Sequence, residues 1–149
     1  MEEALLKKID EISEEMISGI KRVVQIDSVQ SEAKPGMPFG EGVNKALEEA
    51  LKLARELGFE TENVDHMVGI AKYGQGEDYI GIMGHLDVVP VGKGWNHPPF
   101  SAYEDENGRI FARGILDNKG PTLSCLYALY AIDTFNKLGY KAKINTHTT

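Results

Sequence analysis

Apolar residues recur at spacings of three and four in two segments near the start of the chain. The first segment predicts a helix over about Glu2 to Ile26, and the second predicts a helix after the loop at 27–40. The apolar stripes consist of Leu5, Ile9, Ile12, Met16, Ile20 and Val23 in the first helix, and of Val43, Ala46, Leu47, Ala50, Leu51, Ala54 and Leu57 in the second. Gly58 is suited to end the second helix in a left-handed conformation.

Shorter apolar runs in the middle of the chain are typical of strands. Residues 59–73 predict one or two short strands, and residues 100–103 and 109–112 flank a polar turn, which predicts a hairpin. Residues 79–84 form a continuous apolar run. Such a run is typical of a central strand that other elements cover on both faces.

A third helix is predicted over 121–138, with Pro121 in its first turn and Gly139 at its end. It is apolar on most sides, which indicates deep burial, and residues 141–145 begin a further strand. The order of helix, helix, strands, helix and strand predicts an α/β fold in which helices flank a mixed sheet. The last strand has barely begun when the chain ends at Thr149, so we expect an unpaired sheet edge.

Composition and charge narrow the range of functions. The chain has 149 residues and a formal net charge of −7, which disfavours binding to nucleic acid or to an anionic membrane. No apolar run approaches the length that spans a bilayer, and the first residues are amphipathic and acidic, unlike a signal peptide. Because Cys125 is the single cysteine, no intrachain disulfide is possible, and we expect a cytoplasmic location.

Two residues at the end of the 79–84 run have metal-binding chemistry. His85 and Asp87 lie two apart, so in a strand both side chains point the same way, at the edge where open α/β sheets bind ligands. A neutral imidazole is a good zinc ligand. Asp87 could be the acceptor that orients its other ring nitrogen, or could take part in the chemistry directly. The alternative is that His85 caps the strand and Asp87 is a turn residue.

A third candidate, Asp117, comes just before the third predicted helix, where the helix dipole favours a carboxylate. It is either an N-cap, with Asn118 as the alternative cap, or a metal ligand whose two oxygens can bridge two cations. The loop of Trp95, His97 and the prolines that follow either shapes a substrate wall or packs on the surface, and His97 itself is expected to be structural.

Several separated motifs together resemble one enzyme family. They are Gly84–Pro90 (GHLDVVP), Gly94-Trp95, His97–Phe100 (HPPF), Arg113-Gly114 and Asp117–Pro121 (DNKGP). In this order and spacing they resemble the co-catalytic di-zinc peptidases and deacylases, a family that includes aminoacylases, acetylornithine and succinyl-diaminopimelate deacylases, carboxypeptidase G, carnosinases and PepV-type dipeptidases. Trp95, the HPPF sequence and the Lys119–Pro121 ending are most similar to the PepV-type dipeptidases, although these commonly carry an aspartate where this chain has Asn118.

The resemblance implies a role for each candidate residue. His85 would bind one zinc ion, Asp117 would bridge two, and Asp87 would be the catalytic acidic residue on the His85 side of the site. A water activated by the metal pair would hydrolyse the peptide bond of a dipeptide, or the amide bond of a small N-acyl amino acid. Co²⁺ or Mn²⁺ could replace zinc, because nitrogen and oxygen ligands tolerate several metals.

In the family, the glutamate that acts as general base and the remaining ligands follow the strand that residues 141–145 resemble. We therefore expect residues 1–149 to be the truncated N-terminal part of such a catalytic domain, without its lid domain and inactive alone. The alternatives are a non-catalytic fragment or remnant, and one piece of a split enzyme that a C-terminal partner chain completes by pairing with a sheet edge. A plain α/β binding domain is the remaining interpretation.

Overall fold

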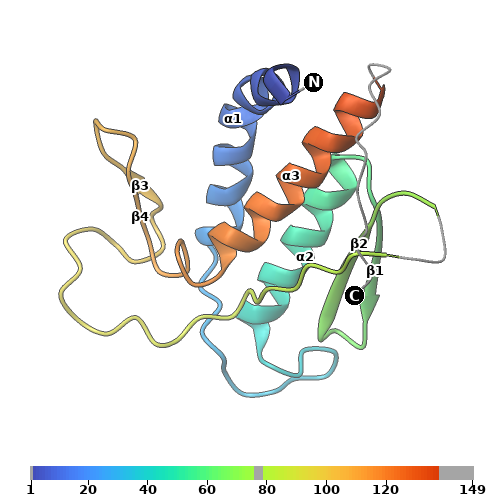
Figure 1. Ribbon diagram of the computed structural model, residues 1–149. Helices are drawn as coiled ribbons and strands as arrows, with labels where there is room; N and C mark the ends of the chain where they lie inside the picture. Colours follow the sequence, from blue (N-terminus) through green and yellow to red (C-terminus); the bar gives the residue numbers. More distant parts are fainter. Residues whose placement is uncertain (1, 76–78, 138–149) are drawn as a thin grey trace, which may run out of the picture.

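The computed structural model of the protein describes residues 2–75 and 79–137, which contain three helices and two β-hairpins (Figure 1). In chain order the elements are α1 (Glu2–Val24), α2 (Glu41–Glu56), β1 (Glu60–Val64), β2 (Val68–Lys72), β3 (Tyr103–Glu104), β4 (Ile110–Phe111) and α3 (Lys119–Lys137). The α/β class is confirmed. The predicted strand at 141–145 and the predicted helix end at Gly139 lie outside the described residues. In the described ranges no helix is long and apolar enough to cross a membrane.

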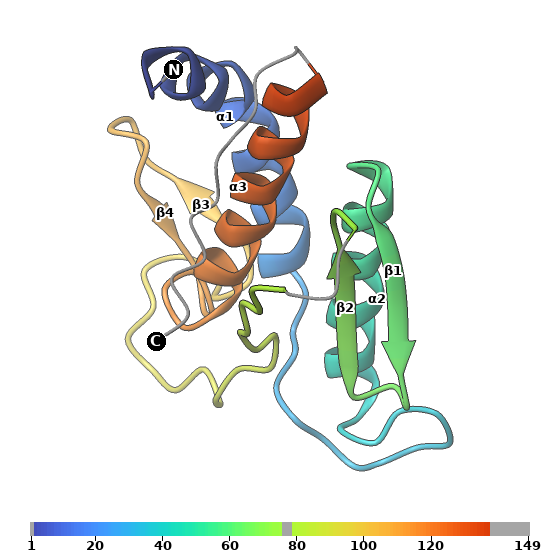
Figure 2. The ribbon, with the colours of Figure 1, turned by 45° about the vertical axis from the view of Figure 1, so that its right-hand side comes forward.

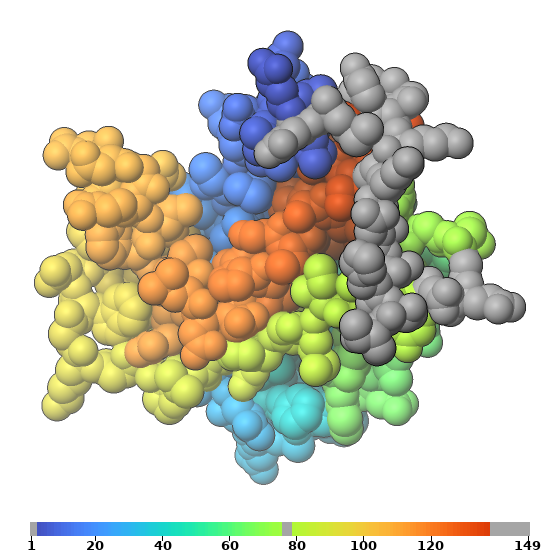
Figure 3. Space-filling model, in the orientation of Figure 1, coloured from blue at the N-terminus to red at the C-terminus, as the bar shows by residue number. Residues whose placement is uncertain are grey.

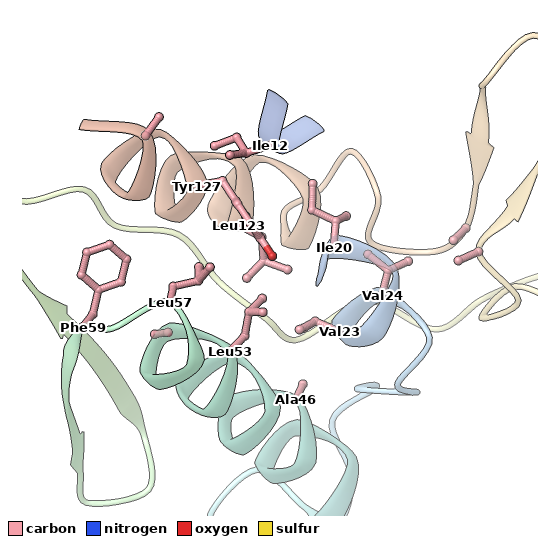
Figure 4. Packing of buried hydrophobic residues seen from close by; sticks show 14 residues of the cluster. Ile12, Ile20, Val23, Val24, Ala46, Leu53, Leu57, Phe59, Leu123 and Tyr127 are labelled. Atoms are coloured by element: carbon pink, nitrogen blue, oxygen red, sulfur yellow. The ribbon is translucent and has the colours of Figure 1, made fainter. Parts of the chain in front are cut away.

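The hydrophobic core lies between the three helices (Figure 4). The apolar stripes predicted for the first two helices supply part of it, because side chains three and four residues apart share one face. The fully or nearly buried residues of this core include Ile12, Ile20, Val23 and Val24 of α1, Ala46, Leu53 and Ala54 of α2, Leu57 and Phe59 after it, and Leu123, Tyr127 and Ala131 of α3. Ile9 of the predicted stripe is 38% exposed, so the stripe is less buried toward the N-terminal end of α1.

Helices α1 and α3 make the most extensive contact between helices, and a glycine lets them approach closely. A Cβ atom on Gly19 of α1 would overlap the Tyr127 hydroxyl of α3. That hydroxyl donates a hydrogen bond to the Glu15 backbone carbonyl at 3.1 Å. Burial raises the pKa of Tyr127 to about 12, so the phenol stays protonated and remains a donor at neutral pH.

The contact between α1 and α2 is smaller and includes charged groups. The Arg22 guanidinium of α1 donates from Nε to Glu49 at 2.8 Å and from Nη1 to Glu56 at 2.6 Å. These two carboxylates raise the pKa of Arg22, so the cation is fully charged at any physiological pH. Helix α2 ends as predicted, with Gly58 in the left-handed region at φ +91°.

Each hairpin forms a separate two-stranded antiparallel sheet (Figure 2). Strands β1 and β2 pair from Glu60–Lys72 to Val64–Val68 and lie against α2. Strands β3 and β4 pair over two residues each and project away from the helices at the other side of the molecule (Figure 1). Both hairpins confirm strands that the alternation and turn residues predict.

The buried central strand predicted at residues 79–84 is wrong for the described chain. This segment has no helix or strand assignment, and Tyr79, Ile80, Ile82 and Met83 are 90%, 65%, 71% and 97% exposed. A strand exists only with a neighbour that accepts and donates its ladder hydrogen bonds. Among the described residues no segment supplies that neighbour, so no mixed sheet forms there.

Replacing Gly19 by alanine is expected to destabilise the chain, although alanine is the better helix former by about 1 kcal/mol. The methyl group would meet the buried Tyr127 hydroxyl, and overpacking of this kind costs about 1–3 kcal/mol. The free energy of unfolding, from urea denaturation, should therefore fall. Ser18→Ala, at an exposed position one residue earlier, is the matched control and should not lower it.

A Tyr127→Phe background separates the clash from other effects of the substitution. Because this background lacks the hydroxyl, Gly19→Ala should lower the free energy of unfolding there by at most about half as much as in the wild-type background. Such non-additivity is typical of contacting residues in double-mutant cycles. An equal cost in both backgrounds would show that the hydroxyl does not oppose the methyl group.

Candidate metal centre

The segment that carries His85 and Asp87 is attached to the loop that follows α1. The Ser28 hydroxyl, which is fully buried, donates to the Leu86 carbonyl at 2.6 Å. The Val88 amide donates to the Ser28 carbonyl at 3.1 Å, and Val29 and Val88 form an isolated parallel bridge. These contacts hold the backbone on both sides of Asp87, although no regular strand is present.

Gly84 brings the same segment against the first turn of α3. A Cβ atom on Gly84 would overlap Oγ1 of Thr122 and would lie 2.7 Å from Oδ1 of Asn118. Only a glycine allows the backbone to lie this close to α3 without moving those side chains. Because His85 follows directly, this approach determines how near the imidazole lies to Asp117.

Lys119 holds the start of α3 on the end of α1. Its side chain is fully buried, and the ammonium donates to the carbonyls of Val23 at 3.2 Å and Ile26 at 2.7 Å. The Val23 carbonyl lies at the C-terminal end of α1 and the Ile26 carbonyl lies just after it, where the helix dipole favours a cation. Burial lowers the pKa of Lys119 to about 8, and the carboxylate of Asp27 opposes that shift.

The imidazole of His85 lies between two aspartates. Its Nε2 is 3.0 Å from Oδ1 of Asp117, and its Nδ1 is 3.1 Å from the backbone carbonyl of Asp87 and 3.2 Å from Oδ1 of the same residue. The side chains of His85, Asp87 and Asp117 are 49%, 53% and 83% exposed, so the group is open to solvent. The structure therefore brings together all three residues for which the sequence predicts a role.

Two opposing effects determine the protonation of His85. Burial lowers its pKa, whereas the hydrogen bonds to Asp117 and to the Asp87 carbonyl, together with both carboxylate charges, raise it. The net pKa is above the ordinary value of 6.5. In the metal-free chain the contact between Nε2 and Asp117 thus occupies the place where Nε2 would offer its lone pair to a cation.

The donor set fits one end of a zinc site. An imidazole nitrogen and a carboxylate oxygen are both zinc ligands, and two ligands of one tetrahedral zinc lie about 3.3 Å apart by simple geometry. The 3.0 Å between His85 and Asp117 is close to that separation. Asp87 meets the opposite ring nitrogen, as a partner that orients a histidine ligand does. In the ranges 2–75 and 79–137, however, no three His, Cys, Asp or Glu side chains form a ligand cluster.

The first turn of α3 resolves one alternative that the sequence left open. Asn118, rather than Asp117, occupies the N-cap position, because α3 begins at Lys119 and the Asn118 carbonyl accepts from the Thr122 amide at 3.0 Å. Oδ1 of Asn118 accepts from the Thr122 hydroxyl at 2.6 Å. The side chain of Asp117 points instead to His85. The peptide bond between Asp117 and Asn118 is cis.

The loop of Trp95 and His97 is packed by its own contacts. The indole of Trp95 donates to the Val91 carbonyl at 2.8 Å, and the Arg113 guanidinium lies 5.3 Å from the centre of its ring. His97 stacks on Tyr103 with ring centres 3.6 Å apart, which agrees with the structural role expected for it.

A cleft of about 590 Å³ lies elsewhere, between the loop after α1 and the start of α2. None of His85, Asp87 and Asp117 lines it, and its charged residues Glu41 and Lys45 pair with each other at 2.7 Å. The cleft therefore lies apart from the candidate metal ligands.

Sequence reasoning missed the contributions of Ser28, Gly84 and Lys119. A signal was present for Lys119, because a cation in the first turn of a helix is electrostatically unfavourable unless something else stabilises it. The C-terminal end of α1 is that stabilising partner. No comparable signal exists for Ser28, whose role depends on which loop the 86–88 backbone meets.

Comparison with known proteins finds a matching family model and proteins of similar sequence. Residues 81–144 match the model of peptidase family M20/M25/M40. YtjP of Bacillus subtilis (strain 168), a provisionally assigned dipeptidase, is 47% identical over 125 residues, which are 83% of this chain and 27% of YtjP. A provisionally assigned dipeptidase of Staphylococcus aureus (strain USA300) is 38% identical over 141 residues, which are 93% of this chain and 30% of that protein.

Two solved structures have a similar fold. The crystal structure of human carnosine dipeptidase 1 matches with a TM-score of 0.66 and 25% identity, over 93% of this chain and 32% of that one. The dipeptidase Dug1p of Saccharomyces cerevisiae matches with a TM-score of 0.56 and 21% identity, over 92% of this chain and 31% of that one, which shows likeness of fold alone. The chain thus spans about a third or less of the length of these relatives.

The contact between His85 and Asp117 predicts a measurable pKa. In the metal-free chain, an NMR titration of the His85 ring should give a pKa above 6.5, and Asp117→Asn should lower it because the carboxylate charge is lost. Asp10→Asn, an exposed substitution on α1, is the control and should leave it unchanged. Because the folded-state pKa is the higher one, this contact stabilises the fold below about pH 6.5 and stops doing so as pH rises through the folded-state value. An unchanged pKa in Asp117→Asn would contradict the contact.

Gly84→Ala is expected to separate His85 from Asp117. The new methyl group has no room beside Thr122 and Asn118, so the 84–87 backbone must move away from α3. The pKa of His85 should then fall toward or below 6.5, since the partner that raises it is lost. Gly81→Ala is the matched control in the same segment, because a Cβ there meets nothing within 4 Å. If both alanine variants keep the wild-type pKa, Gly84 does not position His85.

Proposed function

Since the chain is a relative of the enzymes of peptidase family M20/M25/M40, we propose that it contributes the first metal ligands of a zinc-dependent dipeptidase. The observation that carries the proposal is the placement of His85 between Asp117 and Asp87, with one aspartate at each ring nitrogen. The match of residues 81–144 covers all three residues. The relatives that bear the name dipeptidase supply the substrate class.

Each residue has a distinct part in this proposal. With a metal ion bound, Nδ1 of His85 would donate its proton to Asp87, which would leave the lone pair of Nε2 for the cation. Nε2 and a carboxylate oxygen of Asp117 would hold one zinc ion. Only Oδ1 of Asp117 meets His85, and the side chain is 83% exposed, so its second oxygen can reach a second cation. The bound ions supply the Lewis acidity that hydrolysis of an unreactive peptide bond needs.

The described residues hold two ligands, whereas a catalytic zinc site usually has three from the protein. We therefore expect the chain by itself to bind zinc weakly and not to hydrolyse dipeptides. Residues 1–149 would be one part of a catalytic domain, and the general base and further ligands would come from outside the described residues. Co²⁺ or Mn²⁺ would also suit this nitrogen and oxygen donor set. The acidic, single-cysteine composition suits a cytoplasmic enzyme.

A second candidate is a non-catalytic chain that acts only with a complementary polypeptide. The observation that favours it is the exposed apolar segment before His85, where Ile80 and Ile82 are 65% and 71% exposed. Both candidates have the same metal ligands, and both predict no turnover by this chain alone. They differ in whether the remaining ligands and the general base belong to the same polypeptide or to a separate one.

Metal titration tests the ligand assignment. Co²⁺ absorption spectra of the purified chain should show weak binding, which His85→Gln and Asp117→Asn each reduce by about tenfold or more, since each removes one of the two ligands. His66→Gln is the matched control, because His66 is an exposed histidine in the turn between β1 and β2. Unchanged Co²⁺ binding in His85→Gln would contradict the assignment of His85 as a metal ligand. Zinc-dependent hydrolysis of a dipeptide by the chain alone would contradict the proposal that its site is incomplete.

A further inference from the structure

The two segments that carry the metal-ligand candidates are both attached to one short stretch of the chain, residues 23–28, here the 23–28 turn. This stretch contains the last residues of α1 and the first residues of the loop after it. It contacts the His85 segment through Ser28 and the Asp117 segment through Lys119. His85 and Asp117 lie 32 residues apart in the sequence, so tertiary contacts of this kind determine whether they meet.

The His85 side of the site is held at its backbone. The hydroxyl of Ser28 is fully buried and donates to the Leu86 carbonyl at 2.6 Å. The Val88 amide donates in turn to the Ser28 carbonyl at 3.1 Å. A buried hydroxyl cannot exchange its partner for water without loss of free energy, so the 23–28 turn fixes the residue that directly follows His85.

The Asp117 side is held through a loop that closes on itself. The Gly120 amide donates to the Gly114 carbonyl at 3.4 Å, so the two ends of the loop that carries Asp117 lie together. From this loop the buried ammonium of Lys119 reaches the 23–28 turn, where it donates to two carbonyls at 2.7 and 3.2 Å. The position of the loop relative to α1 therefore depends on a single side chain two residues after Asp117.

Gly114 lets the two attachments pack against each other. A Cβ atom on Gly114 would lie 2.9 Å from Cγ1 of Val88 and 3.2 Å from Cδ of Lys119. The Val88 side chain and the Lys119 stem thus occupy the space that a larger residue would fill, and the φ of +87° also favours glycine. This packing accounts for the glycine of the Arg113-Gly114 motif, to which the metal ligands gave no role.

We propose that Ser28 and Lys119 are positioning residues of the metal centre, and that both act through the 23–28 turn, which sets the separation of His85 and Asp117. Their polar atoms bond to backbone carbonyls rather than to the ligands, so they act through the backbone. This inference rests on the proposed function, because it concerns the same two ligands. Loss of either contact separates the ligands, so loss of the second contact adds little.

Metal titration of three variants and one control tests the proposal. Lys119→Met removes the ammonium but keeps a side chain of similar length, and Ser28→Ala removes the hydroxyl. Each should weaken Co²⁺ binding, followed by absorption, by about tenfold, as loss of a group that orients a metal ligand does. The double variant should also lose about tenfold, rather than the about hundredfold loss of two independent sites.

Tyr127→Phe is the matched control. The Tyr127 hydroxyl also joins α3 to a backbone carbonyl of α1, but it does so further along both helices, away from His85. Removal of this hydrogen bond should leave Co²⁺ binding unchanged. A contact that only stabilises the packing of the two helices would give the same result in the control as in Lys119→Met.

A second measurement needs no metal ion. In the metal-free chain at one fixed pH, the NMR shifts of the two His85 ring nitrogens report their protonation, which their hydrogen-bond partners determine. In Lys119→Met and in Ser28→Ala these shifts should move toward those of Asp117→Asn, which lacks the carboxylate. In Tyr127→Phe they should keep their wild-type values.

The outcomes separate this inference from the proposed function. Unchanged Co²⁺ binding in His85→Gln contradicts the proposed function, and the ring-nitrogen shifts then still test the positioning role. Wild-type shifts in either Lys119→Met or Ser28→Ala overturn that role, as do equal changes in Tyr127→Phe. An about hundredfold loss of Co²⁺ binding in the double variant overturns the shared turn.

Circular dichroism shows whether each variant folds. If Lys119→Met is unfolded, Ser28→Ala decides by the same two measurements, because it removes one hydroxyl and no charge. Unfolding of both single variants overturns the proposal, because the two contacts then maintain the fold as a whole rather than the separation of the ligands.

Discussion

The buried ammonium of Lys119 is the contact on which the rest of the arrangement depends. By donating to the carbonyls of Val23 and Ile26, it joins the end of α1 to the start of α3. The loop that leaves α1 can then reach the 86–88 backbone through Ser28, and the residue two before Lys119 can meet His85. A charge buried in this way costs solvation energy, which the lowered pKa reflects, and it is tolerated because two carbonyls and the α1 dipole stabilise the cation.

The candidate site is thus built by backbone approach rather than by a sheet. In an ordinary α/β protein, the ends of paired strands place the ligands. Here Gly84 lies against Asn118 and Thr122, and a serine hydroxyl replaces the missing ladder hydrogen bonds. The result is a histidine between two carboxylates in a largely solvent-accessible position. High exposure weakens the electrostatic attraction for a cation, because water screens the charges.

The parts of the fold that local sequence determines were predictable. The helices follow from apolar spacing, and the β1–β2 and β3–β4 hairpins follow from alternation and turn residues. The outcome at 79–84 was not predictable, because whether this apolar segment forms a strand depends on neighbouring strands, which local sequence does not reveal. The three site residues were predictable as a group from motif order, and Gly84 was predictable only as part of the first motif. The way they meet was not predictable, since the burial of Lys119 and Ser28 depends on tertiary approach.

The contacts between the elements are unequal in extent, and this inequality has a consequence for motion. Helices α1 and α3 pack extensively and lie side by side on the face seen in Figure 3. Helix α2 contacts the β1–β2 hairpin more than it contacts α1. Proteins unfold locally in cooperative units whose free energies of opening differ, and these units separate where the contacts between them are fewest. The α2 and hairpin unit can therefore open while α1, α3 and the Lys119 contact stay closed. The His85 group, which is attached to the α1 and α3 part, would survive such partial unfolding.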